Sequence, residues 1–119
     1  MEAISVARFV HTSPTKLRRI ADAIRGQRVP EALATLQYLP GPSARTVSKV
    51  VRSAVANADN LFGLEPDELY VAEIAVDGAG RTRNTRRWRP GPRGRYMMMR
   101  RRSSHIQVVV RAFGEEYEY

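Results

Sequence analysis

The sequence predicts an α+β fold: a small antiparallel sheet of about three strands, covered on one face by three helices and carrying a long protruding β-hairpin. Strand patterns lie near both ends of the chain, three segments between them have helical spacing, and an arginine-rich segment separates the last two strands. We expect residues 1–119 to form a single domain, because this length leaves no room for a second domain of ordinary size.

The first helix is expected to start at Ser13-Pro14. Ser13 can cap it, and Pro14 suits the first helical position because no hydrogen bond is lost there. Gly26 is expected to close the helix in the left-handed conformation. The apolar stripe of this helix has helical spacing and consists of Leu17, Ile20, Ala21 and Ile24.

Two more helices are expected on either side of the breaking run Pro40-Gly41-Pro42. The second should begin at Pro30, and the third should be capped by Ser43 and end at Gly63 and Pro66. The inward residues of the second are Ala32, Leu33 and Leu36. The stripe of the third is Ala44, Val47, Val51, Ala54, Val55 and Ala58, whose small side chains allow close packing.

Three strands complete the expected body. Apolar residues alternate with others from Tyr70 to Val76, and the segment from His105 to Val110 is rich in β-branched residues. A weaker strand pattern runs from Ile4 to Phe9. Strands at both ends with helices between them favour an antiparallel sheet with the helices packed on it.

The net charge of +8 is concentrated in one segment. Residues 1–77 hold nine Lys or Arg and nine acids, whereas residues 78–111 hold eleven Arg and no acid. The chain therefore divides into a neutral body (residues 1–77 and 103–113), a cationic hairpin (residues 78–102) and an acidic tail (residues 114–119). Charge of one sign focused in this way is typical of an element that binds a polyanion.

The segment between the last two strands is too long for a structureless loop in a compact domain. Its turn residues, Pro90-Gly91-Pro92 and Gly94, predict a hairpin with its tip near residues 89–94. Two arms of about ten residues each would reach about 30 Å from the body. Because an isolated two-stranded ribbon is marginally stable and like charges repel, we expect an anionic partner to stabilise it.

Arginine suits a nucleic-acid partner, because its guanidinium group offers a planar fork of donors to phosphate oxygens and stacks on bases. Trp88 and Tyr96 flank the expected tip, where they are placed to stack on unpaired bases. Codon bias would explain the choice of arginine over lysine, since Lys16 and Lys49 are the only lysines. Codon bias would not explain why residues 78–111 contain no acid.

Other classes of protein find little support. The chain has no cysteine, and no apolar run approaches the length of a membrane span. No carboxylate pair, metal-ligand spacing or nucleophile-base set emerges, so we expect no enzyme, metal or cofactor, no membrane association and no homo-oligomer. His105 is expected to have a structural role instead of acting as a ligand, and His11 is no better candidate for a ligand. A helix-turn-helix DNA-binding protein remains the alternative, although the charge excess lies outside the helices.

Several motifs in a shared order resemble the L-twenty-two family of large-subunit ribosomal proteins, of bacterial or organellar type. The similarity spans roughly residues 4 to 111. The motifs are Thr12-Ser13-Pro14-Thr15-Lys16, Ile24-Arg25-Gly26, Ser53-Ala54-Val55-Ala56-Asn57-Ala58, Arg89-Pro90 with Gly94-Arg95, and Ser104-His105-Ile106-Gln107-Val108-Val109-Val110.

The resemblance implies a structural protein that binds rRNA of the 23S type, aids subunit assembly and lines the exit tunnel with its hairpin. Its implied partners are rRNA, neighbouring large-subunit proteins and the nascent polypeptide, in a bacterial cytoplasm or an organelle that makes its own ribosomes. Met97, Met98 and Met99 fit either a soft surface for that polypeptide or packing across the hairpin. The implied rRNA contacts are Lys16, Arg18, Arg19, Arg81, Arg83, Arg86, Arg87, Trp88, Arg89, Arg93, Arg95, Tyr96, Arg100, Arg101 and Arg102.

The resemblance also implies that residues 88–93 form the tunnel tip: Trp88, Arg89, Pro90, Gly91, Pro92 and Arg93. Here Pro90-Gly91-Pro92 stands where the family usually has Pro-Arg-Ala, and the hairpin is a few residues longer. For Lys16, Arg18 and Arg19 on the first helix, the alternative interpretation is a solvated helix face.

Overall fold

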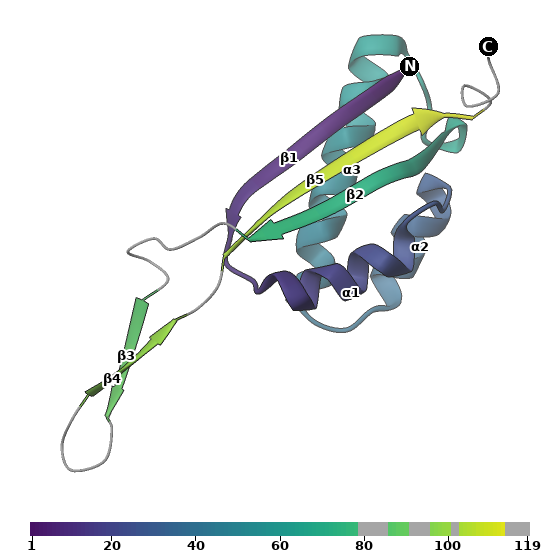
Figure 1. Cartoon of the computed structure of the whole chain (residues 1–119). Coiled ribbons are helices and arrows are strands. Elements are labelled where there is room, and N and C mark those ends of the chain that lie inside the picture. The colour runs from purple at the N-terminus through teal and green to yellow at the C-terminus, as the bar shows by residue number, and fades with distance from the viewer. Residues whose placement is uncertain (79–85, 91–95, 101–102, 114–119) are drawn as a thin grey trace.

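The computed structural model describes residues 1–78, 86–90, 96–100 and 103–113, with the backbone alone described at 86–90 and 96–100. In chain order the elements are β1 (Glu2–Val10), α1 (Pro14–Ile24), α2 (Val29–Tyr38), α3 (Pro42–Phe62), the 3-10 turn η1 (Pro66–Glu68), β2 (Leu69–Gly78), β3 (Arg86–Pro90), β4 (Tyr96–Arg100) and β5 (Ser104–Ala112). The predicted α+β class, with three helices and a three-stranded antiparallel sheet, is confirmed (Figure 1).

The last strand of the chain occupies the centre of the sheet. The order is β1-β5-β2, and β5 pairs antiparallel with both neighbours. Figure 1 shows the three helices together on one face of this sheet. On that face α3 packs across β1 and β5, and α1 packs across β2.

The core lies between this face and the helices. From the sheet, Ile106, Val108 and Val110 of β5 are fully buried, with Val71 of β2 beside Val110. The helices contribute the apolar stripes that their spacing predicted, including Leu17, Ala21 and Ile24 from α1 and Val47, Val51 and Ala54 from α3. Burial of these side chains is the main source of stability for the body.

A β-bulge changes the inward face of β2. The register passes from Val71 opposite Val110 directly to Glu73 opposite Val109, so Ala72 has no partner. As a result Leu69 and Val71 are buried before the bulge and Ile74 and Val76 after it. Regular alternation would place Tyr70 on the same face of the sheet as Ile74. Because the bulge adds one residue, Ala72, Tyr70 lies on the opposite face instead.

One expected helix cap is confirmed in position only, and a second is wrong. Ser13 is in the capping position of α1 but its side chain makes no capping hydrogen bond. Helix α3 begins at Pro42 instead of after Ser43, because Gly41 (φ 96°) takes the capping position and Pro42 fits the first helical turn. Helix α2 begins at Val29, one residue before the predicted Pro30.

Two antiparallel strands lie within the segment predicted to form the hairpin. β3 pairs with β4 from Arg86 opposite Arg100 to Pro90 opposite Tyr96. Figure 1 shows this pair standing away from the three-stranded sheet, and the principal extents are 65 × 26 × 23 Å. Of the expected tip at residues 89–94, residues 91–94 lie outside the described residues.

The core predicts a large contrast between two leucines. Leu17 is fully buried and Leu61 is 68% exposed. We expect Leu17→Ala to lower the free energy of unfolding by about 2–5 kcal/mol, because a cavity remains in the core. The matched control Leu61→Ala should change it by less than about 0.5 kcal/mol. Urea denaturation of both variants measures the difference, and equal effects would contradict the packing described.

Candidate nucleic-acid interface

The register of β2 and β5 fixes the root of the arginine-rich segment, which we call the arm (residues 79–103). Gly78 lies opposite Ser104, so the chain leaves the sheet and returns to it at adjacent positions. The Ser104 side chain is fully buried, and its hydroxyl donates a hydrogen bond to the Thr12 carbonyl (2.7 Å). This bond ties the root of the arm to the turn that precedes α1.

A second contact holds the same end of the sheet. Phe9 adopts a left-handed backbone conformation (φ 55°) in the irregular part of β1, and its N–H donates to Nδ1 of His105 (3.1 Å). The two rings meet edge to face with centroids 4.8 Å apart. His105 therefore has a structural role, as expected from the sequence.

The pairing of β3 with β4 places positively charged residues opposite each other. Arg86 and Arg100 are partners across the ribbon, and Arg87 and Arg89 face Met99 and Met97. Like charges directly opposite each other destabilise a strand pair. An anion close to this ribbon would remove that penalty.

The predicted contact residues of the arm divide into two groups. Those within β3 and β4, with a described backbone, are Arg86, Arg87, Trp88, Arg89, Pro90, Tyr96 and Arg100. Those outside the described residues are Arg81, Arg83, Gly91, Pro92, Arg93, Arg95, Arg101 and Arg102.

The predicted contacts on α1 lie beside the root of the arm. Helix α1 follows the Thr12 turn directly, and Lys16, Arg18 and Arg19 are exposed on it. Arg18 has a structural contact, because its Nε donates to the Val76 carbonyl of β2 (3.2 Å). Within the described ranges, Lys16 and Arg19 make no hydrogen bond or ion pair.

Three other arginines are engaged within the body, and one of them, Arg28, donates to the Asp67 carbonyl (3.2 Å). Arg25 binds Asp22 (2.6 Å) and donates to the Ile74 carbonyl (2.8 Å). Arg111 donates from Nε to the Glu2 carboxylate (2.8 Å), and this hydrogen bond raises the pKa of Arg111 above its ordinary value. The arm therefore carries the remaining ten of the eleven arginines counted in residues 78–111.

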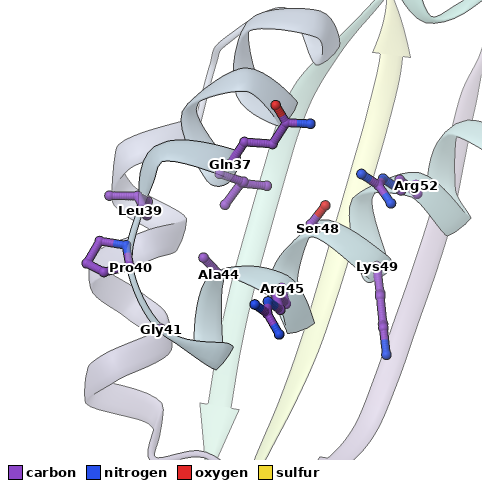
Figure 2. A pocket seen from close by; sticks show the side chains of 10 residues that line it. Gln37, Leu39, Pro40, Gly41, Ala44, Arg45, Ser48, Lys49 and Arg52 are labelled. Carbon is purple, nitrogen blue, oxygen red and sulfur yellow. The ribbon is translucent and has the colours of Figure 1, made fainter.

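One group of cations was missed from the sequence. Arg45, Lys49 and Arg52 lie along one side of α3 and line a groove of about 510 Å³ between α2 and α3 (Figure 2). Their spacing of i, i+4 and i+7 was a visible signal of a shared helix face. The groove itself depends on how α2 packs against α3, which sequence spacing does not give.

The described parts of the chain lack two kinds of site. No three His, Cys, Asp or Glu side chains gather there in a way that could hold a metal ion. Nor does any helix of those parts have the length and apolarity needed to cross a membrane.

Comparison with known proteins gives one consistent result. Residues 5–111 match the family described as Ribosomal protein L22p/L17e. Similar proteins include the "Large ribosomal subunit protein uL22" of Thermotoga sp. (strain RQ2), 47% identical over 119 residues, which are all of this chain and 73% of the relative. The protein of the same name from Clostridium acetobutylicum is 46% identical over 111 residues, 93% of this chain and 97% of the relative. That of Pelotomaculum thermopropionicum is 47% identical over 110 residues, with 92% and 95% covered.

The three cations of α1 should differ in their effect on stability. We expect Arg18→Ala to lower the free energy of unfolding by about 1 kcal/mol, because the Val76 carbonyl loses its donor. Lys16→Ala and Arg19→Ala should each change it by less than about 0.5 kcal/mol. Thermal or urea unfolding decides the matter, and equal stability of all three variants would show that the Arg18 contact contributes nothing.

Proposed function

Because the chain belongs to the ribosomal protein L22p/L17e family and has a structural role in the large ribosomal subunit, we propose that it binds the rRNA of that subunit through its arm. The observation that supports this proposal most strongly is the distribution of charge along the chain. Ten arginines and no acid lie between two paired strands of a nearly neutral body. A folded RNA is the polyanion that such a protein meets in its subunit.

The body can present the arm without rRNA supporting its own fold. Its core is apolar, and the described part of the chain contains no buried side-chain polar atom without a hydrogen-bond partner. The arm has the opposite character, because its ribbon pairs Arg86 with Arg100. Phosphate groups would satisfy these guanidinium groups with charge-assisted hydrogen bonds, which are stronger than neutral ones.

The cations of α1 extend this interface onto the body. The Ser104–Thr12 hydrogen bond joins the root of the arm to the start of α1, and Lys16 and Arg19 are exposed a few residues further on. We include Lys16, Arg18 and Arg19 in the proposed rRNA contact, with Arg18 also holding α1 to β2. A single RNA surface can then contact both the arm and the first turns of α1.

Finer parts of the proposal follow from the family. The tip, residues 88–93, would line the nascent-polypeptide exit tunnel, with Trp88 and Tyr96 stacking on unpaired bases. The body would contact neighbouring large-subunit proteins and aid assembly, and the protein would be located in the ribosome. Stacking by Trp88 and Tyr96 is consistent with their positions on the paired strands β3 and β4.

Removing the arm tests the proposal directly. If about six phosphates are neutralised, the logarithm of affinity for a 23S-type rRNA fragment should fall against the logarithm of salt concentration with a slope of about −4 to −5. Deletion of residues 81–102 should remove most of this slope. The deletion leaves residues 79, 80 and 103 between the paired Gly78 and Ser104, a loop length common in β-hairpins, so the body should keep its helical circular dichroism.

A full-length variant with glutamine at all ten arm arginines is the matched control, because it loses the charge and keeps the length. It should lose the slope as the deletion does. Unchanged rRNA affinity in the deletion variant would overturn the proposal. Tight, sequence-selective binding of duplex DNA by the wild-type protein would instead favour the DNA-binding alternative.

A further inference from the structure

We propose that the groove between α2 and α3 is a second RNA site, which holds the phosphate backbone of a double-helical segment. This inference rests on the proposed binding of rRNA and adds a contact remote in sequence from the arm. Arg45, Lys49 and Arg52 supply the positive charge, and Gln37 and Ser48 supply neutral polar groups beside them (Figure 2).

The three cations are spaced to follow one strand. They occupy positions i, i+4 and i+7 of α3, so they form a stripe along the helix about 10 Å long at the usual rise per residue. Successive cations in such a stripe are separated by about 5–6 Å between Cβ atoms. This separation resembles that of neighbouring phosphates on a nucleic-acid strand.

The charge of the stripe is not neutralised by the protein. Arg45, Lys49 and Arg52 make no hydrogen bond or ion pair with any residue of the described ranges, and no acid lines the groove. Arg18, Arg25, Arg28 and Arg111, by contrast, all bind carbonyls or carboxylates of the body. Three free cations on a helix repel one another, so a polyanion is the partner that stabilises them.

The lining favours the backbone of paired RNA over unpaired bases. It contains no aromatic side chain on which a base could stack, and its apolar part is formed by Leu36, Leu39, Pro40 and Ala44. A ribose can lie against such a wall. The amide of Gln37 and the hydroxyl of Ser48 can both donate to and accept from a 2′-hydroxyl, which is the group that distinguishes RNA from DNA.

The test compares two full-length triple variants. The groove variant is Arg45→Ala, Lys49→Ala and Arg52→Ala, which should fold normally because the three side chains are unpartnered and alanine favours helix. The control variant is Ala34→Glu, Asn60→Glu and Gln107→Glu, which removes the same net charge at exposed positions outside the groove. Both are titrated with a mixed-sequence RNA duplex over a range of salt concentrations.

In this duplex titration we expect the groove to contribute about 2 to 3 units of the salt slope beyond the contribution of the arm. The groove variant should lose that part as three phosphate contacts disappear, while the control keeps a slope close to that of the wild type. Sequence changes in the duplex should not alter the loss. A groove variant that binds like the wild type, or no worse than the control, overturns the inference. If the proposed function itself were wrong, the result would differ from this one, because the wild-type protein would then bind no rRNA.

A second variant tests the chemistry of the neutral groups. Gln37→Ala with Ser48→Ala should reduce the preference for the RNA duplex over the DNA duplex of the same sequence and leave the salt slope unchanged. An unchanged preference would show that Gln37 and Ser48 do not contact a 2′-hydroxyl.

The identity of the partner is tested in assembled subunits. A photo-reactive residue placed at the exposed position Gln37 should cross-link to rRNA. A cross-link to another subunit protein, with no cross-link to RNA, would show that the groove holds a protein segment and would overturn the inference.

Discussion

The central position of β5 is the constraint on which the other features of this protein depend. The last strand of the chain is inserted between β1 and β2, so the segment that precedes it has to leave the sheet beside β2 and return beside the same strand. The paired residues Gly78 and Ser104 therefore hold both ends of the arm together. The buried hydroxyl of Ser104 extends this control to the Thr12 turn and to the direction in which α1 begins.

The same arrangement separates stability from recognition. The body buries its apolar stripes between one face of the sheet and three helices, and its charges nearly cancel. The arm concentrates the excess charge where no core residue depends on it. A protein arranged in this way can fold before its partner is present, and the proposed rRNA contact then stabilises the β3–β4 ribbon, which is weak by itself. The groove beside α3 would give the body its own share of the proposed contact.

Local sequence signals predicted most of the fold, because helix periodicity, turn residues and strand propensity act over short distances. They predicted three helices, the closing Gly26 and Gly63, and the arginine-rich segment between strands. Non-local features were not predictable. The bulge at Ala72 depends on pairing with β5, the contact of Arg18 depends on how α1 crosses β2, and the groove depends on how α2 packs against α3. Gly41 displaced Ser43 as a cap because Pro42 fits the first helical turn.

We propose that the body folds alone and that rRNA supplies the stability of the arm. Amide hydrogen exchange, measured on the free protein and on the protein in assembled large subunits, tests it most directly. We expect the amides of β5 to be protected in both states, whereas those of β3 and β4 gain protection in the subunit. Equal protection of β3 and β4 in the two states, or a β5 that is protected only in the subunit, would contradict it.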